Sequence, residues 1–107
     1  MPACLVYITA ASAEEATRIG RTVVEERLAA CVNVHSPITS IYRWQDAIQQ
    51  DSETVLIAKT PDRLIDRLVE RVVELHSYDC PCIVAVPVVG GHRPFLDWID
   101  AETEISE

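Results

Sequence analysis

The sequence predicts an α+β fold: a ferredoxin-like βαββαβ arrangement with an antiparallel sheet, a long β-hairpin and a short C-terminal helix. Four runs rich in β-branched residues are separated, in order, by an amphipathic helical segment, a polar stretch and a second amphipathic segment. The 107 residues suit one compact domain, which we assign to residues 1–107.

The first two elements are expected between residues 4 and 28. Residues 4–9 (CLVYIT) are almost wholly apolar, as in a strand covered on both faces. Ser12 and Glu15 then match a capping box, in which the hydroxyl accepts a helix amide and the carboxylate reaches back. The helix that follows carries its expected core side chains at helical spacing: Ala16, Ile19, Val23, Val24 and Leu28.

A long hairpin is expected next. Residues 31–44 and 54–59 read as its strands, and the polar residues 45–52 connect them. Ser36-Pro37 interrupts the first strand, because proline has no amide to donate, so we expect a bulge or bend there.

The last elements begin at Thr60-Pro61-Asp62, which predicts a helix with Thr60 as N-cap. An apolar stripe over residues 64–75 includes Val73 and should be buried, and the segment before Pro81 ends this helix. Residues 82–89 form the fourth strand, placed at a sheet edge by Pro87. A short helix over residues 93–99 follows. The two long helices cover one sheet face, so the apolar second face predicts self-association.

The charge balance disfavours negatively charged binding partners. Nine Lys plus Arg against 17 Asp plus Glu give a net charge of −8, which disfavours nucleic acid and anionic membrane surfaces. Apolar runs are too short to span a bilayer, and we expect no signal peptide. We therefore expect a cytoplasmic protein with four reduced cysteines.

Several sequence blocks at matching spacing resemble the CutA divalent-cation tolerance family from end to end. They are residues 25–33 (EERLAACVN), 39–44 (TSIYRW), 59–60 (KT), 76–78 (HSY), 87–91 (PVVGG) and 96–98 (LDW). The resemblance implies a ferredoxin-like homotrimer with hairpins paired between subunits, in a cytoplasmic protein linked to copper and divalent-cation tolerance. It implies no enzymatic activity, and animal relatives are associated with acetylcholinesterase anchoring. The family's copper ligands, one cysteine and two histidines, fall on Ile8, Leu75 and His76, so His76 alone is kept.

A metal site is predicted at Cys80, Cys82 and His76. Side chains two residues apart on an extended backbone point to the same face, and His76 lies four residues earlier. Thiolate and imidazole ligands suit copper, as Cu(I) or Cu(II), or another divalent metal such as zinc. The alternative is ordinary packing of cysteines at the start of a strand. Cys31 is expected in the core, and Cys4 is expected to be accessible.

A second candidate site is a ligand cleft between subunits, built from Lys59, Tyr78, Tyr42 and Trp44. Lys59 is the only lysine, and could hold an anion or small metabolite. The alternative is an ion pair of Lys59 with Glu53 or a helix carboxylate. Tyr42 and Trp44 are interpreted as interface anchors.

Two functions remain open at this stage. The first is a trimer that binds copper or another divalent metal ion and serves the response to metal ions. The second is a non-catalytic structural or signalling trimer that binds a small metabolite or anion and an unidentified protein partner. We predict no enzyme, because no nucleophile and base are paired and Gly90-Gly91 lacks the spacing of a phosphate-binding loop.

Overall fold

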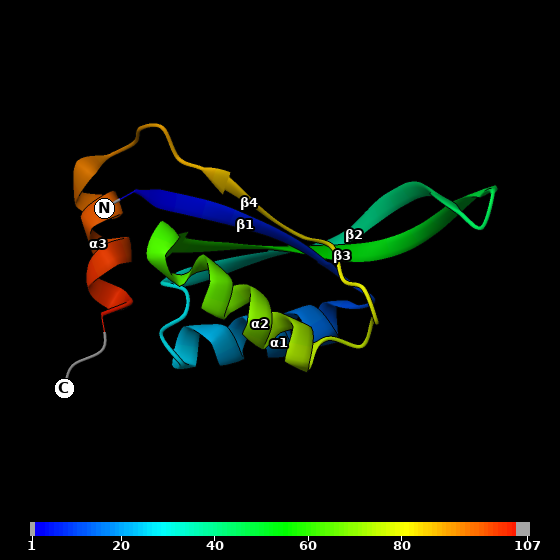
Figure 1. Cartoon of the computed structure of the whole chain (residues 1–107), viewed down its shortest axis with the longest axis horizontal. Coiled ribbons are helices and arrows are strands. Elements are labelled where there is room, and N and C mark those ends of the chain that lie inside the picture. The colour runs from blue at the N-terminus through cyan, green and yellow to red at the C-terminus, as the bar shows by residue number, and fades with distance from the viewer. Residues whose placement is uncertain (1, 105–107) are drawn as a thin grey trace.

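The computed structural model describes residues 2–104 and contains the predicted βαββαβ order followed by a terminal helix (Figure 1). A short 3₁₀ turn, η1, lies between β3 and α2. The elements are β1 (Ala3–Ala10), α1 (Ala13–Glu25), β2 (Cys31–Trp44), β3 (Ala47–Pro61), η1 (Asp62–Leu64), α2 (Ile65–Leu75), β4 (Ile83–Pro87) and α3 (Arg93–Glu102).

The four strands form one antiparallel sheet in the order β2-β3-β1-β4. In the register of the sheet, Tyr7 of β1 lies opposite Ile57 of β3 and Val84 of β4. This strand order is that of the split βαβ arrangement, so the predicted fold class is confirmed. Strand β4 lies at an edge, as Pro87 predicted.

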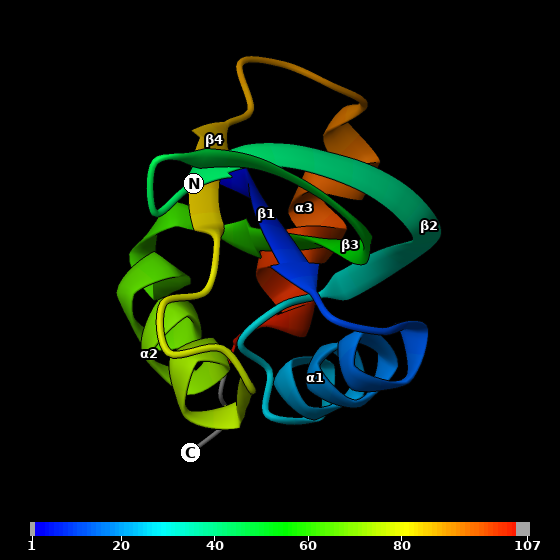
Figure 2. The same cartoon turned by 90° about the vertical axis from the view of Figure 1, so that its right-hand side faces the viewer.

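Helices α1 and α2 cover the same face of the sheet, which Figures 1 and 2 show from two directions. Val6, Ile8 and Leu56 point to this face, and each is 0% exposed. The other face carries Leu5, Tyr7, Ile57, Val84 and Val86, which we call the open face. Leu5 is 36% exposed and Val84 51%, so this chain alone leaves an apolar surface in water.

Strands β2 and β3 run together past the rest of the sheet as a long hairpin (Figure 1). Gln45 and Asp46 both have positive φ, 50° and 64°, as in a two-residue hairpin turn. The pairing of Trp44 with Ala47 therefore starts β3 directly after this turn, and the expected polar connection over residues 45–52 is wrong. The expected irregularity at Ser36-Pro37 is confirmed, because the register shifts there around a cis peptide bond.

The predicted start of the second helix is also wrong. Thr60 does not cap it: this residue still lies within β3, one position before its end, and is 0% exposed. Its hydroxyl donates to the Leu28 carbonyl at 2.7 Å. The hydroxyl therefore satisfies a buried loop carbonyl, and α2 begins only after η1. Two side chains expected in the core, Val24 and Val73, are 37% and 47% exposed. Strand β4 is shorter than expected, and α3 is longer.

Candidate functional site

His76 lies immediately after α2, and its side chain is fully buried. The ring contacts backbone at both nitrogens: Nε2 lies 2.7 Å from the Thr9 carbonyl oxygen, and Nδ1 accepts the Tyr78 amide at 3.0 Å. A carbonyl only accepts and an amide only donates, so these contacts require the neutral ring with its proton on Nε2. Both ring nitrogens are thus occupied within the chain.

Glu15 ties helix α1 to the segment after α2. Its carboxylate accepts the Ala11 amide at 3.1 Å and the Ser77 amide at 2.8 Å. Burial raises the pKa of this carboxyl, but the hydrogen bonds from Ser77 and Ala11 outweigh it and hold the pKa below its ordinary value of 4.5. The capping box predicted the reach toward the helix start, and the Ser12 hydroxyl does accept the Glu15 amide at 3.1 Å. The bond to Ser77, 62 residues away, had no local sequence signal.

Tyr78 connects the same segment to the hairpin. Its hydroxyl donates to a Glu53 carboxylate oxygen at 2.8 Å, and its ring lies 4.7 Å from the His76 ring, centroid to centroid. Burial, the hydrogen bond to Glu53 and the carboxylate charge raise the pKa of Tyr78 to about 12. Residues 76–78 are therefore fixed from three sides, by β1, α1 and β3.

Cys80 and Cys82 are free thiols on the surface, just before β4. Within residues 2–104, no three His, Cys, Asp or Glu side chains gather closely enough to hold one metal ion. A single chain therefore does not bring His76 together with the two thiols. Cys4 is only 5% exposed, so the expectation that it is accessible is wrong; burial and the charge of Asp62 raise its thiol pKa.

The single chain brings Tyr42 close enough to Tyr78 to contribute to its raised pKa, but it leaves Lys59 apart from them at the other end of β3. Lys59 donates to the Asn33 side-chain oxygen at 2.7 Å, with its ammonium 5.6 Å from the Phe95 ring centre. The expected pairing of Lys59 with Glu53 is wrong, because Glu53 lies six residues earlier along β3 and accepts from Tyr78 instead.

The two hairpin members of that set are exposed. Tyr42 donates to the Asp51 carboxylate on the neighbouring strand, and this bond, with the Asp51 charge, raises the pKa of Tyr42. Trp44 stands at the end of β2 and is 61% exposed. Any cleft containing all four residues would need side chains from more than one chain.

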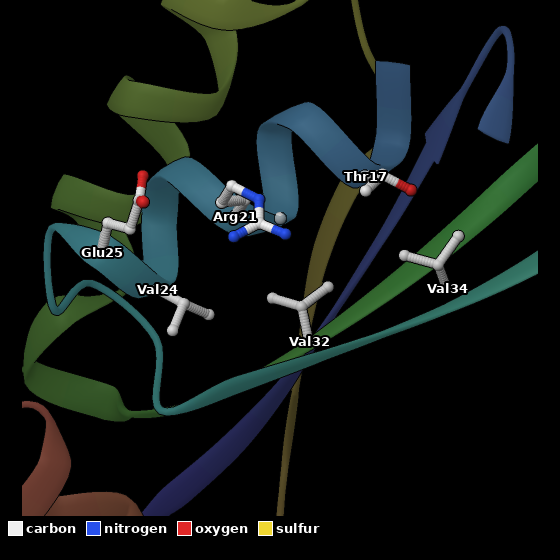
Figure 3. A pocket seen from close by; sticks show the side chains of 7 residues that line it. Thr17, Arg21, Val24, Glu25, Val32 and Val34 are labelled. Atoms are coloured by element: carbon white, nitrogen blue, oxygen red, sulfur yellow. The ribbon is translucent and has the colours of Figure 1, made fainter. Parts of the chain in front are cut away.

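A shallow groove runs between α1 and β2 (Figure 3). It has a volume of about 300 Å³ and is lined by Thr17, Gly20, Arg21, Val24, Glu25, Val32 and Val34. Helix α1 approaches β2 closely at Gly20: a Cβ at this position would lie 3.1 Å from Val32 Cγ1, so the Val32 side chain would have to shift by a few tenths of an ångström. None of the site residues predicted from the sequence lines this groove.

In the part of the chain that the structure describes, no helix is both long and apolar enough to cross a membrane.

Comparisons with known proteins all point to the same family. The family model described as CutA1 divalent ion tolerance protein matches residues 4–102. A divalent-cation tolerance protein CutA from Thermus thermophilus is 48% identical over 99 residues, covering 92% of this chain and 96% of that protein. The chloroplastic protein CutA 1 of Oryza sativa is 39% identical over 99% of this chain, which spans only 60% of the rice protein.

Solved structures agree with these sequence matches. The crystal structure of CutA1 from Oryza sativa has a TM-score of 0.95 at 39% identity, covering 99% of this chain and 97% of that chain. The periplasmic divalent cation tolerance protein CutA from Archaeoglobus fulgidus has a TM-score of 0.92 at 42% identity, covering 95% and 99%. Sequence and fold match along almost the whole chain, which therefore belongs to the CutA1 divalent ion tolerance family.

Proposed function

We propose that this protein is a non-catalytic homotrimer that binds a soft or divalent metal ion, copper first, through the thiolates of Cys80 and Cys82. Family membership supports the general role in divalent-cation tolerance. The single observation that carries the site is a pair of exposed free thiols two residues apart. Thiolates are the ligands that favour Cu(I) and also hold Zn²⁺.

His76 enters this proposal as an anchor rather than as a ligand. To coordinate a metal, its ring would have to release the Thr9 carbonyl or the Tyr78 amide. Either release leaves a buried polar group without its partner, at a cost of about 1–3 kcal/mol. We therefore propose that His76 holds residues 76–78 in place while the following cysteines take up the metal.

The open face supports self-association. Leu5 and Tyr7 are 36% and 37% exposed in a single chain although they lie on the central strand β1, and Val84 on the edge strand β4 is 51% exposed. An apolar surface of this kind is stabilised when another copy covers it. The number of subunits, three, comes from the resemblance to CutA. Light scattering coupled to gel filtration should give three times the chain mass of 11.9 kDa, and a monomer mass at micromolar concentration would refute the assembly.

Copper titration tests the metal site. Under reducing conditions and against a chromophoric Cu(I) chelator, the wild type should withdraw one Cu(I) per chain. The double variant Cys80→Ser, Cys82→Ser should lose this binding, whereas Cys31→Ser keeps it and serves as the matched control. Equal stoichiometry and affinity in all three proteins would reject the site. The same titration with Zn²⁺ distinguishes a copper site from a general divalent site.

Cysteine thiols stay reduced in the cytoplasm, so we place the protein's action there.

A second candidate function, an anion site at Lys59, is favoured by one observation. The Lys59 ammonium bonds to a neutral amide oxygen and faces an aromatic ring, and neither neutralises its charge. Calorimetric titration with inorganic phosphate should give binding that Lys59→Met removes; binding unaffected by this substitution would exclude the site.

A further inference from the structure

The segment Cys80-Pro81-Cys82 carries two surface thiols separated by one proline. We propose that these two cysteines form a reversible disulfide within one chain, which makes the segment a thiol-oxidation site. The oxidant we assign is a low-molecular-weight disulfide of the glutathione class. The disulfide itself goes beyond the proposed metal binding, and only its consequence for the metal rests on that proposal.

Chain geometry permits this bond without movement of the fold. Along an extended strand, Cα atoms two residues apart are separated by about 6.4–6.8 Å. Disulfides take Cα separations of about 4.4–6.8 Å, so a fully extended segment lies at the upper limit, and a bend at Pro81 brings the pair within range. Residues 81 and 82 precede β4, which begins at Ile83, so rotation about the ψ angle of Pro81 breaks no bond of that strand.

The segment is also free to adjust. Residues 80–82 precede β4, and Pro81 has no backbone N–H, so it donates no hydrogen bond to a neighbouring strand. The one backbone bond between the segment and the sheet is the Thr9 amide donating to the Cys82 carbonyl at 3.3 Å. The structure upstream is held separately, by the contacts of His76 and Tyr78. Formation of a small ring at residues 80–82 therefore leaves both the core and the anchor in place.

The other two cysteines do not compete for these thiols. Cys4 is buried within β1. Cys31 lies opposite Lys59, which lies opposite Leu5, whereas Cys82 bonds to Thr9. Leu5 and Thr9 are four residues apart along β1, which corresponds to about 13 Å. That separation is far beyond the reach of a disulfide, so within one chain each of Cys80 and Cys82 has only the other as a partner.

The reaction is two thiol–disulfide exchanges. One cysteine thiolate attacks a sulfur of glutathione disulfide, forms a mixed disulfide and releases one glutathione thiolate. The second cysteine thiolate attacks the protein-bound sulfur of that mixed disulfide, closes the bond between Cys80 and Cys82, and releases the second glutathione thiolate. The cysteine pair loses two electrons, which the glutathione disulfide gains. The two thiol protons pass through water to the two released glutathiones.

A disulfide across a single intervening residue closes a strained ring, and strained, exposed disulfides are easily reduced. The pair should therefore be reduced under a strongly reducing glutathione poise and oxidised when glutathione disulfide accumulates. The oxidised pair has no thiolate to offer, so the same step would switch off metal binding at Cys80 and Cys82.

Mass spectrometry of the native protein tests the disulfide directly. The reduced protein is incubated with glutathione disulfide, the remaining thiols are blocked with N-ethylmaleimide, and the peptide containing residues 80–82 is mapped. The wild-type peptide should lose the mass of two hydrogen atoms and carry no blocking group. In Cys80→Ser and in Cys82→Ser the remaining thiol should instead retain one glutathione, because no second thiol can displace it. Cys31→Ser should behave as the wild type.

Three results would overturn the proposal: no oxidation of the wild-type peptide, a wild-type peptide that keeps its glutathione, or chains linked to one another on a non-reducing gel. A Cu(I) titration of the oxidised protein then separates the two claims. If the disulfide forms but the reduced protein binds no copper, the proposed function fails and the redox pair stands. If reduced protein binds copper and no disulfide forms, the redox pair alone fails.

Discussion

The two faces of the sheet carry similar side chains in different surroundings. On the helix-covered face, Val6 and Ile8 of β1 are 0% exposed, whereas Leu5 and Tyr7 of the same strand are 36% and 37% exposed on the open face. Strand alternation sends successive side chains to opposite faces, so one apolar run supplies both surfaces. The covered face stabilises the single chain, and the open face is available to stabilise an assembly.

The largest effect is expected for Leu56→Ala on the covered face. Leu56 is 0% exposed among the helices and β1, so its truncation leaves a cavity. The free energy of unfolding should fall by about 2–5 kcal/mol, measured by urea denaturation. The subunit number from light scattering should not change. A cost below about 1 kcal/mol would contradict the assignment of Leu56 to the core.

A smaller loss in the free energy of unfolding is expected for Glu15→Gln, which weakens the hydrogen bonds between the start of α1 and the segment after α2. The amide keeps the shape of the side chain but replaces one accepting oxygen, facing either Ala11 or Ser77, with a donor. A buried amide without its acceptor costs about 1–3 kcal/mol, which chemical denaturation at neutral pH should measure.

The pH dependence supplies a second readout for Glu15. Its folded pKa lies below the ordinary value of 4.5, so its carboxylate stabilises the fold above that pH, and this contribution is lost as the pH falls through the folded pKa. The wild type should lose stability in that acid range more steeply than Glu15→Gln. Glu14→Gln, an exposed change on the same helical turn, is the control and should retain the wild-type slope.

Tyr78→Phe should cost less, about 1–2 kcal/mol, because it removes one hydrogen bond to the Glu53 carboxylate. The raised pKa of about 12 means that the phenol stabilises the fold below pH 10, and that this contribution is lost as the pH rises through 12. Tyrosinate absorbance should therefore lose its most alkaline step in the variant. Tyr42→Phe on the exposed hairpin is the matched control; if both variants cost equally, the anchoring role of Tyr78 is wrong.

Local patterns predicted the elements but missed contacts between distant residues. The strand over residues 31–44 and the bulge or bend at Ser36-Pro37 were readable because they depend on neighbours in sequence. Thr60 looked like a helix N-cap, and its true partner, the Leu28 carbonyl, lies 32 residues earlier. A hydroxyl is suited to either role, and only the tertiary structure decides which carbonyl or amide it meets.

The candidate site divides in the same way. The thiols of Cys80 and Cys82 were identified from their spacing, and the structure places both at the surface. The spacing of His76 to Cys80 indicated a shared metal, but Thr9 and Tyr78 occupy the His76 ring. These two partners lie on β1 and in the loop itself, and no spacing rule for metal ligands detects a ring nitrogen already bound to backbone.

The same substitution placed on each face gives the sharpest comparison, and on the open face it gives the smallest effect. Val6→Thr inserts a hydroxyl into the covered face and should cost about 1–3 kcal/mol with the subunit number unchanged. Val84→Thr changes a side chain that is 51% exposed in the single chain, so its cost should be about 1 kcal/mol or less per chain. The substitution should weaken the association of subunits. On dilution, light scattering should show the variant dissociating at a higher protein concentration than the wild type, while its circular dichroism is unchanged. If Val84→Thr leaves dissociation untouched, the open face is not the surface through which copies of this chain associate.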